Sequence, residues 1–485
     1  MRILITASEM APLVKTGGLG DVVGALPDAL AVHGNDVIVV IPFYRAEILH
    51  SVTTKRLRWE GTVPVGTEAK PYAAYEIVSL NTAFKTILID NNEYFGRAGL
   101  YVNPKTGQDF KDNDLRFSFF SKAVIELVQR MNWQPDIFHV HDWQTSLIPA
   151  YLRTSQKVNR VFTESKSVLT IHNLAYQGKF KKDRFSLLGL SEELIRPTAS
   201  LEFYGETNFL KGGISFADKI TTVSETYARE IQDSLGCGLE GVLRSRSKDL
   251  SGIVNGVDYS VWSPNIDKNL KFRYRDSNIS GKRKNKVELL SDANLPVRED
   301  ALLVGMVSRL VEQKGLRLII EGSKQLFAMN LQLIILGSGD KQIEQDLLRL
   351  EKQYPDRFKL YLKFDERLAH MIEAGADIFL MPSLFEPCGL NQMYSLKYGT
   401  PPVVHRVGGL ADTVIDYDEI SGEGTGFVFE KFNVQSMIVA LARAVTLFGK
   451  KRKWTKLIKN GMKQDFSWKT SAQKYINLFE TLVTK

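Results

Sequence analysis

Hydrophobic residues in the first half of the chain gather into short runs that alternate with longer amphipathic stretches. The runs are rich in β-branched residues, and most end in Gly, Pro, Asn or a charge, which is typical of buried strands. A helical pattern covers 114–131 between two of these runs. Alternation of strand and helix predicts a parallel sheet with helices on both faces. We expect its strands at 1–8, 36–42, 85–90, 136–140, 167–172 and 219–224.

The same alternation begins again in the second half, which predicts a second sheet of the same kind. A single hydrophobic core seldom exceeds about 300 residues, so a chain of 485 residues agrees with two domains. We therefore expect an α/β fold of two Rossmann-like, doubly wound domains. The second strand series is expected at 301–309, 331–339, 357–363, 376–383, 401–405 and 426–430.

The domain boundaries follow from where periodic hydrophobicity stops. Glycines and charges replace apolar residues near 236–250, where we place the hinge. The segment 463–483 predicts an amphipathic helix with Ser467 as a candidate N-cap. We expect domains at 1–240 and 250–460, with a C-terminal helix in 461–485 that packs back on the first domain.

Composition excludes several classes of protein. Hydrophobic residues make up 44% and charged residues 24%, the ordinary globular range. Only two cysteines are present, Cys237 and Cys388, which excludes a disulfide framework or a cysteine zinc site and favours a reducing compartment. No apolar run reaches 18 residues, and the first one stops at Ser8, too short for a signal-peptide core. We expect no membrane partner.

The net charge of +8 permits an anionic partner without requiring one. The basic residues are densest in 271–286, which two interpretations fit: a contact with a polyanion or membrane, or a solvated linker that leads into a helix. We favour the linker, because stacking aromatics are not interleaved there. Nucleic acid is therefore not an expected partner.

A glycine-rich turn follows the first strand. Gly17, Gly18 and Gly20 let the backbone approach a ligand, and the helix that follows favours an anion. Lys15 adds a mobile charge suited to phosphate. A tight structural turn would use the same glycines, but Lys15 and Asp21 beside them favour a binding site. The spacing is not that of a dinucleotide fingerprint.

Two further candidates follow strands of the second domain. Arg309 and Lys314 come after its first strand, where open α/β sheets bind ligands, and two cations suit a diphosphate. Glu386 stands between a strand and a helix, where it could bind sugar hydroxyls or act as a base. Cys388 is read as a packed residue, and the N–H groups of 388–390 would face an anion. Solvated loop charges are the alternative at each place.

Histidines end two strands of the first domain. His172 could polarise a substrate group, or it could be an ordinary core histidine. His139 and His141 stand beside Asp142, yet no further ligands complete a metal site, so we expect none. A second glycine turn at 335–340 is a weak dinucleotide signal.

Seven motifs together resemble the bacterial glycogen synthase and plant starch synthase family. In order along the chain they are KTGGLGDVVGALP, HDWQTSLIPAYL, IHNLAYQG, VNGVD, SRLVEQKG, FEPCGLNQMYSLKYGT and VGGLADTV, from Lys15 to Thr413. The resemblance implies a GT-B glycosyltransferase, in which an acceptor-side domain and a nucleotide-sugar-binding domain face a cleft. It implies transfer of glucose, with retention, from ADP-glucose to the non-reducing end of an α-1,4-glucan such as glycogen, starch or a maltooligosaccharide.

The resemblance also implies a cytoplasmic or plastid-stromal enzyme without metal or cofactor, and assigns roles to residues. Its catalytic group comprises Glu386, His172, Arg309 and Lys314. Its donor-binding group comprises Lys15, Gly17, Gly18, Asp21, Asn255, Cys388, Gly389 and Leu390. Glu9 and Asp142 match positions on the sugar and acceptor side.

Several questions stay open at this point. Lys363 precedes Phe364 where the family often has glycine, so UDP-glucose remains an alternative donor. Retention could arise by double displacement through Glu386 or by same-face attack. The rivals of another class are a two-domain oxidoreductase, whose glycine spacing is missing, and a non-catalytic glucan-binding homologue. Sucrose and trehalose-phosphate synthases are disfavoured by the KTGGL and EPCGL motifs. The oligomeric state is unknown.

Overall fold

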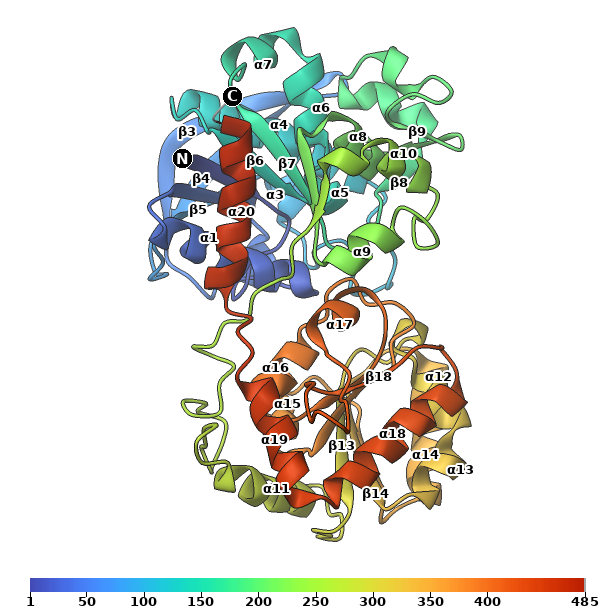
Figure 1. Cartoon of the computed structure of the whole chain (residues 1–485). Helices are drawn as coiled ribbons and strands as arrows, with labels where there is room; N and C mark the ends of the chain where they lie inside the picture. Colours follow the sequence, from blue (N-terminus) through green and yellow to red (C-terminus); the bar gives the residue numbers. More distant parts are fainter. Residues whose placement is uncertain (484–485) are drawn as a thin grey trace. The chain divides into compact units, whose positions relative to one another are not determined.

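The computed structural model describes residues 1–483, which form two compact units (Figure 1). Unit 1 comprises Met1–Val223, Ala228–Gly256 and the helix from Trp468 onwards, and unit 2 comprises Ser224–Tyr227 and Val257–Ser467. Each unit is built on a largely or wholly parallel sheet, which confirms the predicted α/β class.

Unit 1 contains a nine-stranded sheet in the order β12-β11-β7-β6-β1-β2-β5-β4-β3. All neighbours from β12 to β5 are parallel. The six strands predicted from hydrophobic runs are present as β1 (Arg2–Thr6), β2 (Asp36–Pro42), β5 (Lys85–Asp90), β6 (Ile137–His141), β7 (Lys166–Ile171) and β11 (Lys219–Thr222).

Six strands of unit 1 were not predicted. β3 (Thr54–Val65) and β4 (Glu68–Ile77) form an antiparallel hairpin at one edge, where many side chains of β3 are exposed and polar. The segment 236–250 lies inside unit 1, where it holds α10 (Glu240–Ser245) and leads into β12 (Leu250–Gly252). The remaining strands form a separate small sheet: β8 (Lys179–Lys181), β9 (Glu202–Phe203) and β10 (Glu206–Asn208).

Helices α1 (Gly18–Val32) and α20 (Trp468–Val483) contact each other on unit 1 and run side by side in Figure 1. Ser471 on α20 donates a hydrogen bond to the carbonyl of Val254, 2.7 Å away. α4 (Asn113–Arg130) occupies the predicted helical stretch. The shorter helices of this unit are α2 (Arg45–Ile48), α3 (Asn92–Phe95), α5 (Asp142–Thr145), α6 (Leu147–Thr154), α7 (Gln156–Val161), α8 (Phe209–Phe216), η1 (Lys182–Leu188), η2 (Glu192–Ile195) and η3 (Ser247–Asp249).

Unit 2 contains a six-stranded parallel sheet in the order β15-β14-β13-β16-β17-β18. The second predicted strand series is present as β13 (Leu302–Val307), β14 (Leu331–Leu336), β15 (Phe358–Tyr361), β16 (Ile378–Met381), β17 (Pro402–His405) and β18 (Phe427–Phe429). Its helices are α11 (Ser280–Asp292), η4 (Glu312–Lys314), α12 (Leu316–Glu321), α13 (Ser323–Ala328), α14 (Lys341–Gln353), α15 (Glu366–Gly375), α16 (Asn391–Lys397), α17 (Gly408–Thr413), α18 (Val434–Phe448) and α19 (Lys451–Met462). The short α9 (Glu225–Glu230) begins in unit 2 and ends in unit 1.

Two hydrophobic clusters cover the two faces of the sheet in unit 2. On β13, Leu302 and Val304 belong to one cluster and Leu303 to the other, because successive side chains of a strand point to opposite faces. The strands are buried on both sides, which explains why they read as continuous apolar runs.

The basic stretch 271–286 leads into a helix, as the favoured interpretation predicted, but its lysines are not all solvated. Lys282 and Lys286 lie on α11 and are buried. Lys286 forms an ion pair of 2.6 Å with Asp377, and Lys282 donates to the carbonyls of Ala374 and Tyr398. The spacing of four residues places both lysines on the inner face of the helix.

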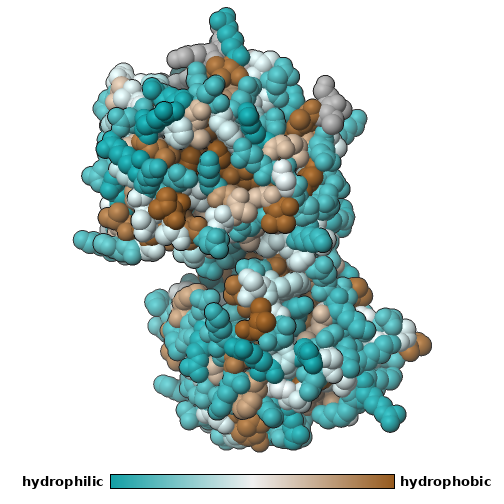
Figure 2. All heavy atoms as spheres, turned by 90° about the vertical axis from the view of Figure 1, so that its left-hand side faces the viewer, coloured by the Kyte–Doolittle hydropathy of each residue, from teal (hydrophilic) through white to brown (hydrophobic). Residues whose placement is uncertain are grey.

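The outer surface of each unit is mostly hydrophilic on the side shown in Figure 2, with hydrophobic residues in separate patches. Among residues 1–483, no helix combines the length and the apolar composition that crossing a membrane requires.

Candidate active site

The candidate site of unit 2 lies beyond the carboxyl ends of two neighbouring strands. β13 leads to Arg309 and η4, and β16 leads to Glu386. The Lys314 ammonium lies 2.6 Å from Oε2 of Glu386, and the two side chains are only 17% and 8% exposed. The structure therefore brings two of the predicted catalytic residues into direct contact.

A glycine allows the loops that carry these two residues to meet. Gly315 has φ +71°, and a Cβ there would lie 1.8 Å from the carbonyl oxygen of Pro382. The loops are further joined by backbone and side-chain bonds of Gln313, whose carbonyl accepts from the N–H of Leu384 at 2.8 Å and whose amide donates to the carbonyl of Phe385 at 3.1 Å. The position of Lys314 is thus fixed by the backbone as well as by its ion pair.

Ser383 is a site residue that sequence reasoning missed. Its hydroxyl donates to Oε2 of Glu386 at 3.0 Å, while its carbonyl oxygen lies 2.8 Å from Nδ1 of His405. Oε2 of Glu386 therefore receives hydrogen bonds from both an ammonium and a hydroxyl. Ser383 lies in the same loop as Glu386, but nothing in its type or spacing distinguishes it from a surface serine.

The groups predicted to bind an anion lie close in sequence to Lys314 or to Glu386. Arg309 is exposed and has no ion pair among the described residues. Cys388 is buried, as expected for a packed residue. Gly389 (φ +71°) and Leu390 immediately precede α16. Their N–H groups donate to no other group in residues 1–483.

In unit 1, the glycine-rich turn leads from β1 into α1. Lys15 and Asp21 form an ion pair of 3.0 Å, with side chains 49% and 33% exposed. A Cβ at Gly17 or Gly18 would meet nothing within 4 Å, whereas one at Gly20 would lie 2.5 Å from Cβ of Lys15. The fold thus requires glycine at position 20 alone, and the space beside the other two glycines is open.

Glu9 holds this turn in place. Its Oε2 accepts from the N–H of Thr16 at 2.5 Å, and its Oε1 accepts from the Thr16 hydroxyl at 2.7 Å and the Tyr101 hydroxyl at 2.6 Å. The carboxylate is buried. Glu9, expected beside the sugar, therefore already has protein partners on both oxygens. Thr16 and Tyr101 were not predicted, and only Thr16 stands inside a recognised motif.

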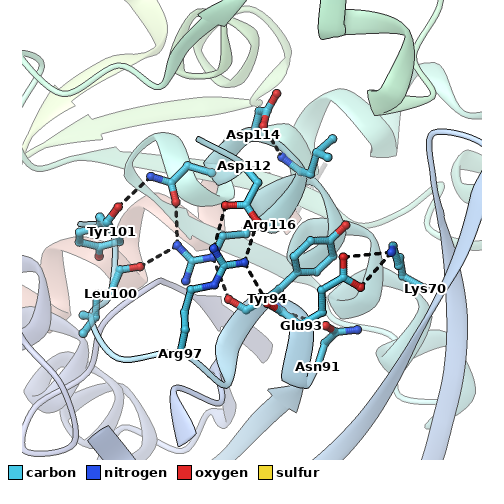
Figure 3. Close-up of polar contacts among 12 residues, drawn as sticks. Lys70, Asn91, Glu93, Tyr94, Arg97, Leu100, Tyr101, Asp112, Asp114 and Arg116 are labelled. Carbon is cyan, nitrogen blue, oxygen red and sulfur yellow. Dashed lines mark hydrogen bonds and ion pairs between the residues drawn. The ribbon is translucent and has the colours of Figure 1, made fainter. Parts of the chain in front are cut away.

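Tyr101 is in turn held by a buried arginine on α4, shown in Figure 3. Arg116 donates to the carbonyls of Tyr94 and Leu100 and to Oδ1 of Asn113, at 2.8, 2.9 and 2.7 Å. The Asn113 amide donates to the carbonyl of Tyr101 at 3.0 Å. The loop before α4 thus reaches the glycine-rich turn through a continuous set of hydrogen bonds.

Asp142 and His172 lie at the ends of β6 and β7. Oδ1 of Asp142 accepts from the backbone N–H of His172 at 2.7 Å. Burial raises the pKa of Asp142 to about 7 and lowers the pKa of His172 to about 3, because both charged forms lose hydration. His172 is therefore neutral near pH 7.

Asn255, the last predicted donor-binding residue of unit 1, is buried, and its Oδ1 has no hydrogen-bond partner within residues 1–483.

The second glycine turn, at 335–340, has a structural explanation rather than a dinucleotide-binding one. A Cβ at Gly337 or Gly339 would lie within 2.4 Å of the carbonyl oxygens of Ser308 or Leu310. No group of three metal-ligating side chains occurs among the described residues.

Comparisons with known proteins identify relatives of both halves of the chain. The family model of the starch synthase catalytic domain matches residues 2–245, and that of glycosyl transferases group 1 matches residues 290–464. The glycogen synthase of Koribacter versatilis is 45% identical over 99% of this chain and 98% of its own length. The glycogen synthase of Thermotoga maritima is 42% identical over 100% of this chain and 99% of its own.

Solved structures agree with these matches. The catalytic domain of starch synthase IV from Arabidopsis thaliana, bound to ADP and acarbose, superposes with a TM-score of 0.90 and 32% identity, covering 100% of this chain and 99% of that one. A sucrose-phosphate synthase from Thermosynechococcus elongatus has a TM-score of 0.60 at 16% identity, over 100% and 99% of the two chains, which supports the fold alone. The predicted GT-B fold is confirmed.

Proposed function

The chain belongs to the family of bacterial glycogen synthases and plant starch synthases, and from this premise we propose that it is a retaining, metal-independent glucosyltransferase. Glucosyl transfer in glucan synthesis is the activity of the family. The finer proposal is that the donor is ADP-glucose and that the acceptor is the non-reducing end of an α-1,4-glucan. The contact between Lys314 and Glu386 is the observation that carries this proposal.

The cations of unit 2 suit the departing diphosphate. As the bond to glucose breaks, negative charge develops on the phosphate oxygens, and preorganised cations lower the free energy of that transition state. Arg309 is without an ion pair among the described residues and can grip two oxygens at once. Lys314 carries three N–H donors, so it can hold Glu386 and still reach a phosphate oxygen. The N–H groups of Gly389 and Leu390 add donors.

Glu386 has the chemistry to bind donor glucose. Its Oε2 accepts from Lys314 and Ser383. Its Oε1 has no hydrogen bond within residues 1–483, so it can bind a sugar hydroxyl or stabilise a positive charge that develops at the anomeric carbon. This arrangement serves same-face attack, in which the leaving phosphate accepts the proton of the acceptor hydroxyl. A covalent glucosyl–Glu386 intermediate is the alternative route to retention.

The residues of unit 1 supply the remaining roles. We assign Lys15 to a donor phosphate, because its ammonium is half-exposed beside the open space at Gly17 and Gly18. Asp21 limits the mobility of Lys15. Asn255 offers a buried, unpaired Oδ1 to the donor.

In unit 1 we assign His172 and Asp142 to sugar binding, and we assign Glu9 to holding the turn rather than to direct contact. A neutral His172 can donate a hydrogen bond from its ring without adding positive charge next to an electron-poor anomeric carbon. We place this activity in the cytoplasm, a reducing compartment, because neither Cys237 nor Cys388 forms a disulfide within residues 1–483.

A donor-exchange assay tests the proposal. The protein is incubated with ADP-glucose or UDP-glucose, each with and without glycogen, and both nucleotide release and chain growth are measured. We expect ADP release that depends on glycogen, with chain growth in equal amount. Nucleotide release without chain growth would contradict synthase activity, and faster turnover of UDP-glucose would contradict the donor assignment.

A further inference from the structure

Three histidines of unit 1 form a continuous row that runs from the buried His139 and His141 to the partly buried His172. His139 and His141 lie two residues apart on β6 and so face the same side of the sheet. Nδ1 of His141 lies 2.9 Å from Nε2 of His172, and the ring centroids of His139 and His141 are 4.2 Å apart. The row therefore connects the core of the sheet with a residue of the candidate site.

Two features hold His141 in this row. Its backbone N–H donates to the Thr145 hydroxyl at 2.8 Å, which fixes the end of β6 to the first turn of α5. On the inner side, Nε2 of His139 lies 2.7 Å from the Thr170 hydroxyl. The ring of Tyr475 on α20 packs against the His139 ring, with 5.2 Å between the ring centroids. The backbone at His141 is thus fixed by Thr145, whereas His139 contributes packing beside the ring, which another aromatic side chain can supply.

All three rings are neutral near pH 7. Burial lowers the pKa of His139 and His172 to about 3 and that of His141 well below its ordinary value, because each imidazolium would lose its hydration. A neutral imidazole carries one proton on either of its two nitrogens. The bond between His141 and His172 therefore has one donor ring and one acceptor ring.

The surroundings of His141 decide which ring donates. Its Nε2 is fully buried and has no partner among the described residues. If the proton were on Nε2, an N–H group would be buried without an acceptor, which is rare in folded proteins. If the proton is on Nδ1, that N–H donates to His172 and only a lone pair is left without a partner. The second arrangement therefore has the lower free energy.

We propose that His141 is a positioning residue that fixes the tautomer and the orientation of His172. His141 donates its Nδ1–H to Nε2 of His172, which places the proton of His172 on Nδ1. His172 is only partly buried, and its Nδ1 forms no hydrogen bond with residues 1–483. Its Nδ1–H is then a preoriented donor for a hydroxyl oxygen of a bound sugar. The catalytic consequence rests on the proposed function, whereas the tautomer does not.

The tautomer can be measured directly, without substrate. The chain contains only seven histidines, so ¹⁵N-histidine labelling gives a tractable NMR spectrum in which His172→Gln identifies the signals of His172. We expect His172 and His141 each to show a protonated Nδ1 and an unprotonated Nε2 at pH 7. A protonated Nε2 on His172 would overturn the proposal, whatever the enzyme's activity.

Substitution then tests the link to catalysis. In His141→Phe we expect His172 to populate the Nε2–H tautomer and kcat to fall about 10- to 100-fold, with little change in the KM for donor, because a reacting group is misplaced. His141→Asn restores an N–H donor close to the same position, so it should restore the Nδ1–H tautomer and part of kcat. His139→Phe, the matched control on the same strand, should leave both readouts near wild type.

The outcomes separate the inference from the proposed function. An unchanged His172 tautomer in His141→Phe would overturn the positioning role, as would a kcat of His139→Phe that falls as far as that of His141→Phe. If His141→Phe fails to fold, the wild-type spectrum and His141→Asn still decide the tautomer. A protein with the expected tautomer but without glucosyl transfer would contradict the proposed function alone.

Discussion

The two units each place a lysine after the first strand of their sheet and pair it with a carboxylate, yet the two pairs differ in burial. Lys15 and Asp21 are 49% and 33% exposed, whereas Lys314 and Glu386 are 17% and 8% exposed. An exposed pair contributes about 0–1 kcal/mol to stability. Removing one partner of a fully buried pair costs about 3–5 kcal/mol.

The difference indicates two ways to position the lysines that we propose for phosphate binding. In unit 2 the ion pair itself holds the lysine in position, because little water is present to weaken the attraction between the two charges. In unit 1 the pair contributes little, and the turn is held from behind by Glu9, which binds Thr16 next to Lys15. We therefore expect loss of function to follow the carboxylate that does the positioning, Glu386 in unit 2 and Glu9, not Asp21, in unit 1.

The largest effect is expected for Glu386→Gln, which keeps the size of the side chain and removes its charge. We expect kcat for glucosyl transfer to fall at least about 100-fold, because the group is proposed to act in the transition state. Initial rates at saturating donor measure this, with circular dichroism to verify the fold. Glu312→Gln is the matched control, because Glu312 is an exposed carboxylate on η4 that pairs with Arg317. Near-wild-type turnover of Glu386→Gln would refute its role.

Lys314→Ala is expected to have the next largest effect. ADP affinity should fall about 10-fold, equivalent to about 1.4 kcal/mol. Its dependence on salt should weaken too, because one cation no longer meets the diphosphate. Calorimetric titration at two salt concentrations measures both effects. Lys341→Ala, an exposed lysine of the same unit, serves as the control and should bind ADP normally. Unchanged affinity in Lys314→Ala would remove the diphosphate assignment.

Thr16→Val tests how the turn is held in unit 1. The substitution preserves shape and removes the hydroxyl that donates to Glu9. Loss of one hydrogen bond to a buried carboxylate should lower the free energy of unfolding by about 1–2 kcal/mol and raise the donor KM about 5-fold. Denaturant unfolding and steady-state kinetics measure the two. Wild-type values in both would show that Glu9 does not position Lys15.

Asp21→Asn should have a smaller effect than Thr16→Val. We expect the free energy of unfolding to change by less than about 1 kcal/mol and the donor KM by less than about 3-fold, with both differences shrinking in high salt. The same measurements apply. A KM effect equal to or above that of Thr16→Val would reverse the comparison between the two units.

Removal of metal should have no effect. We expect the rate to be unchanged after treatment with EDTA, because cations of the chain are proposed to stabilise the leaving diphosphate. An assay in chelator-treated buffer, with and without added Mg²⁺, measures this. Loss of turnover that Mg²⁺ restores would return a metal role to the carboxylates and histidines of the site.

The strands of the two parallel sheets were predictable because burial on both faces leaves an unbroken apolar run. β2 spans Asp36–Pro42, the range expected from the sequence. β3 was missed because it forms the exposed edge of the sheet, where residues such as Arg56 and Glu60 interrupt the apolar pattern. In the basic stretch 271–286, the burial of Lys282 and Lys286 was missed because a count of charges does not show which face of a helix they occupy.

The site was predictable only where its residues lie in recognisable motifs. Lys314 and Glu386 follow strands of one sheet, so their proximity could be expected. Tyr101 could not be found in this way, because its hydrogen bond to Glu9 joins residues 92 positions apart and depends on a loop with no regular pattern. The hydrogen bond between His141 and His172 likewise depends on the pairing of β6 with β7.

The helix α20 belongs to unit 1, although the whole of Val257–Ser467 separates it from the rest of that unit. During synthesis on a ribosome, β1 to β12 emerge before unit 2, and α20 emerges after it. Tyr475, which packs against His139, therefore reaches unit 1 only after unit 2 has been made. The packing around His139 is therefore completed only after unit 2 has been made, so a nascent chain carries a finished unit 2 before it carries a finished unit 1.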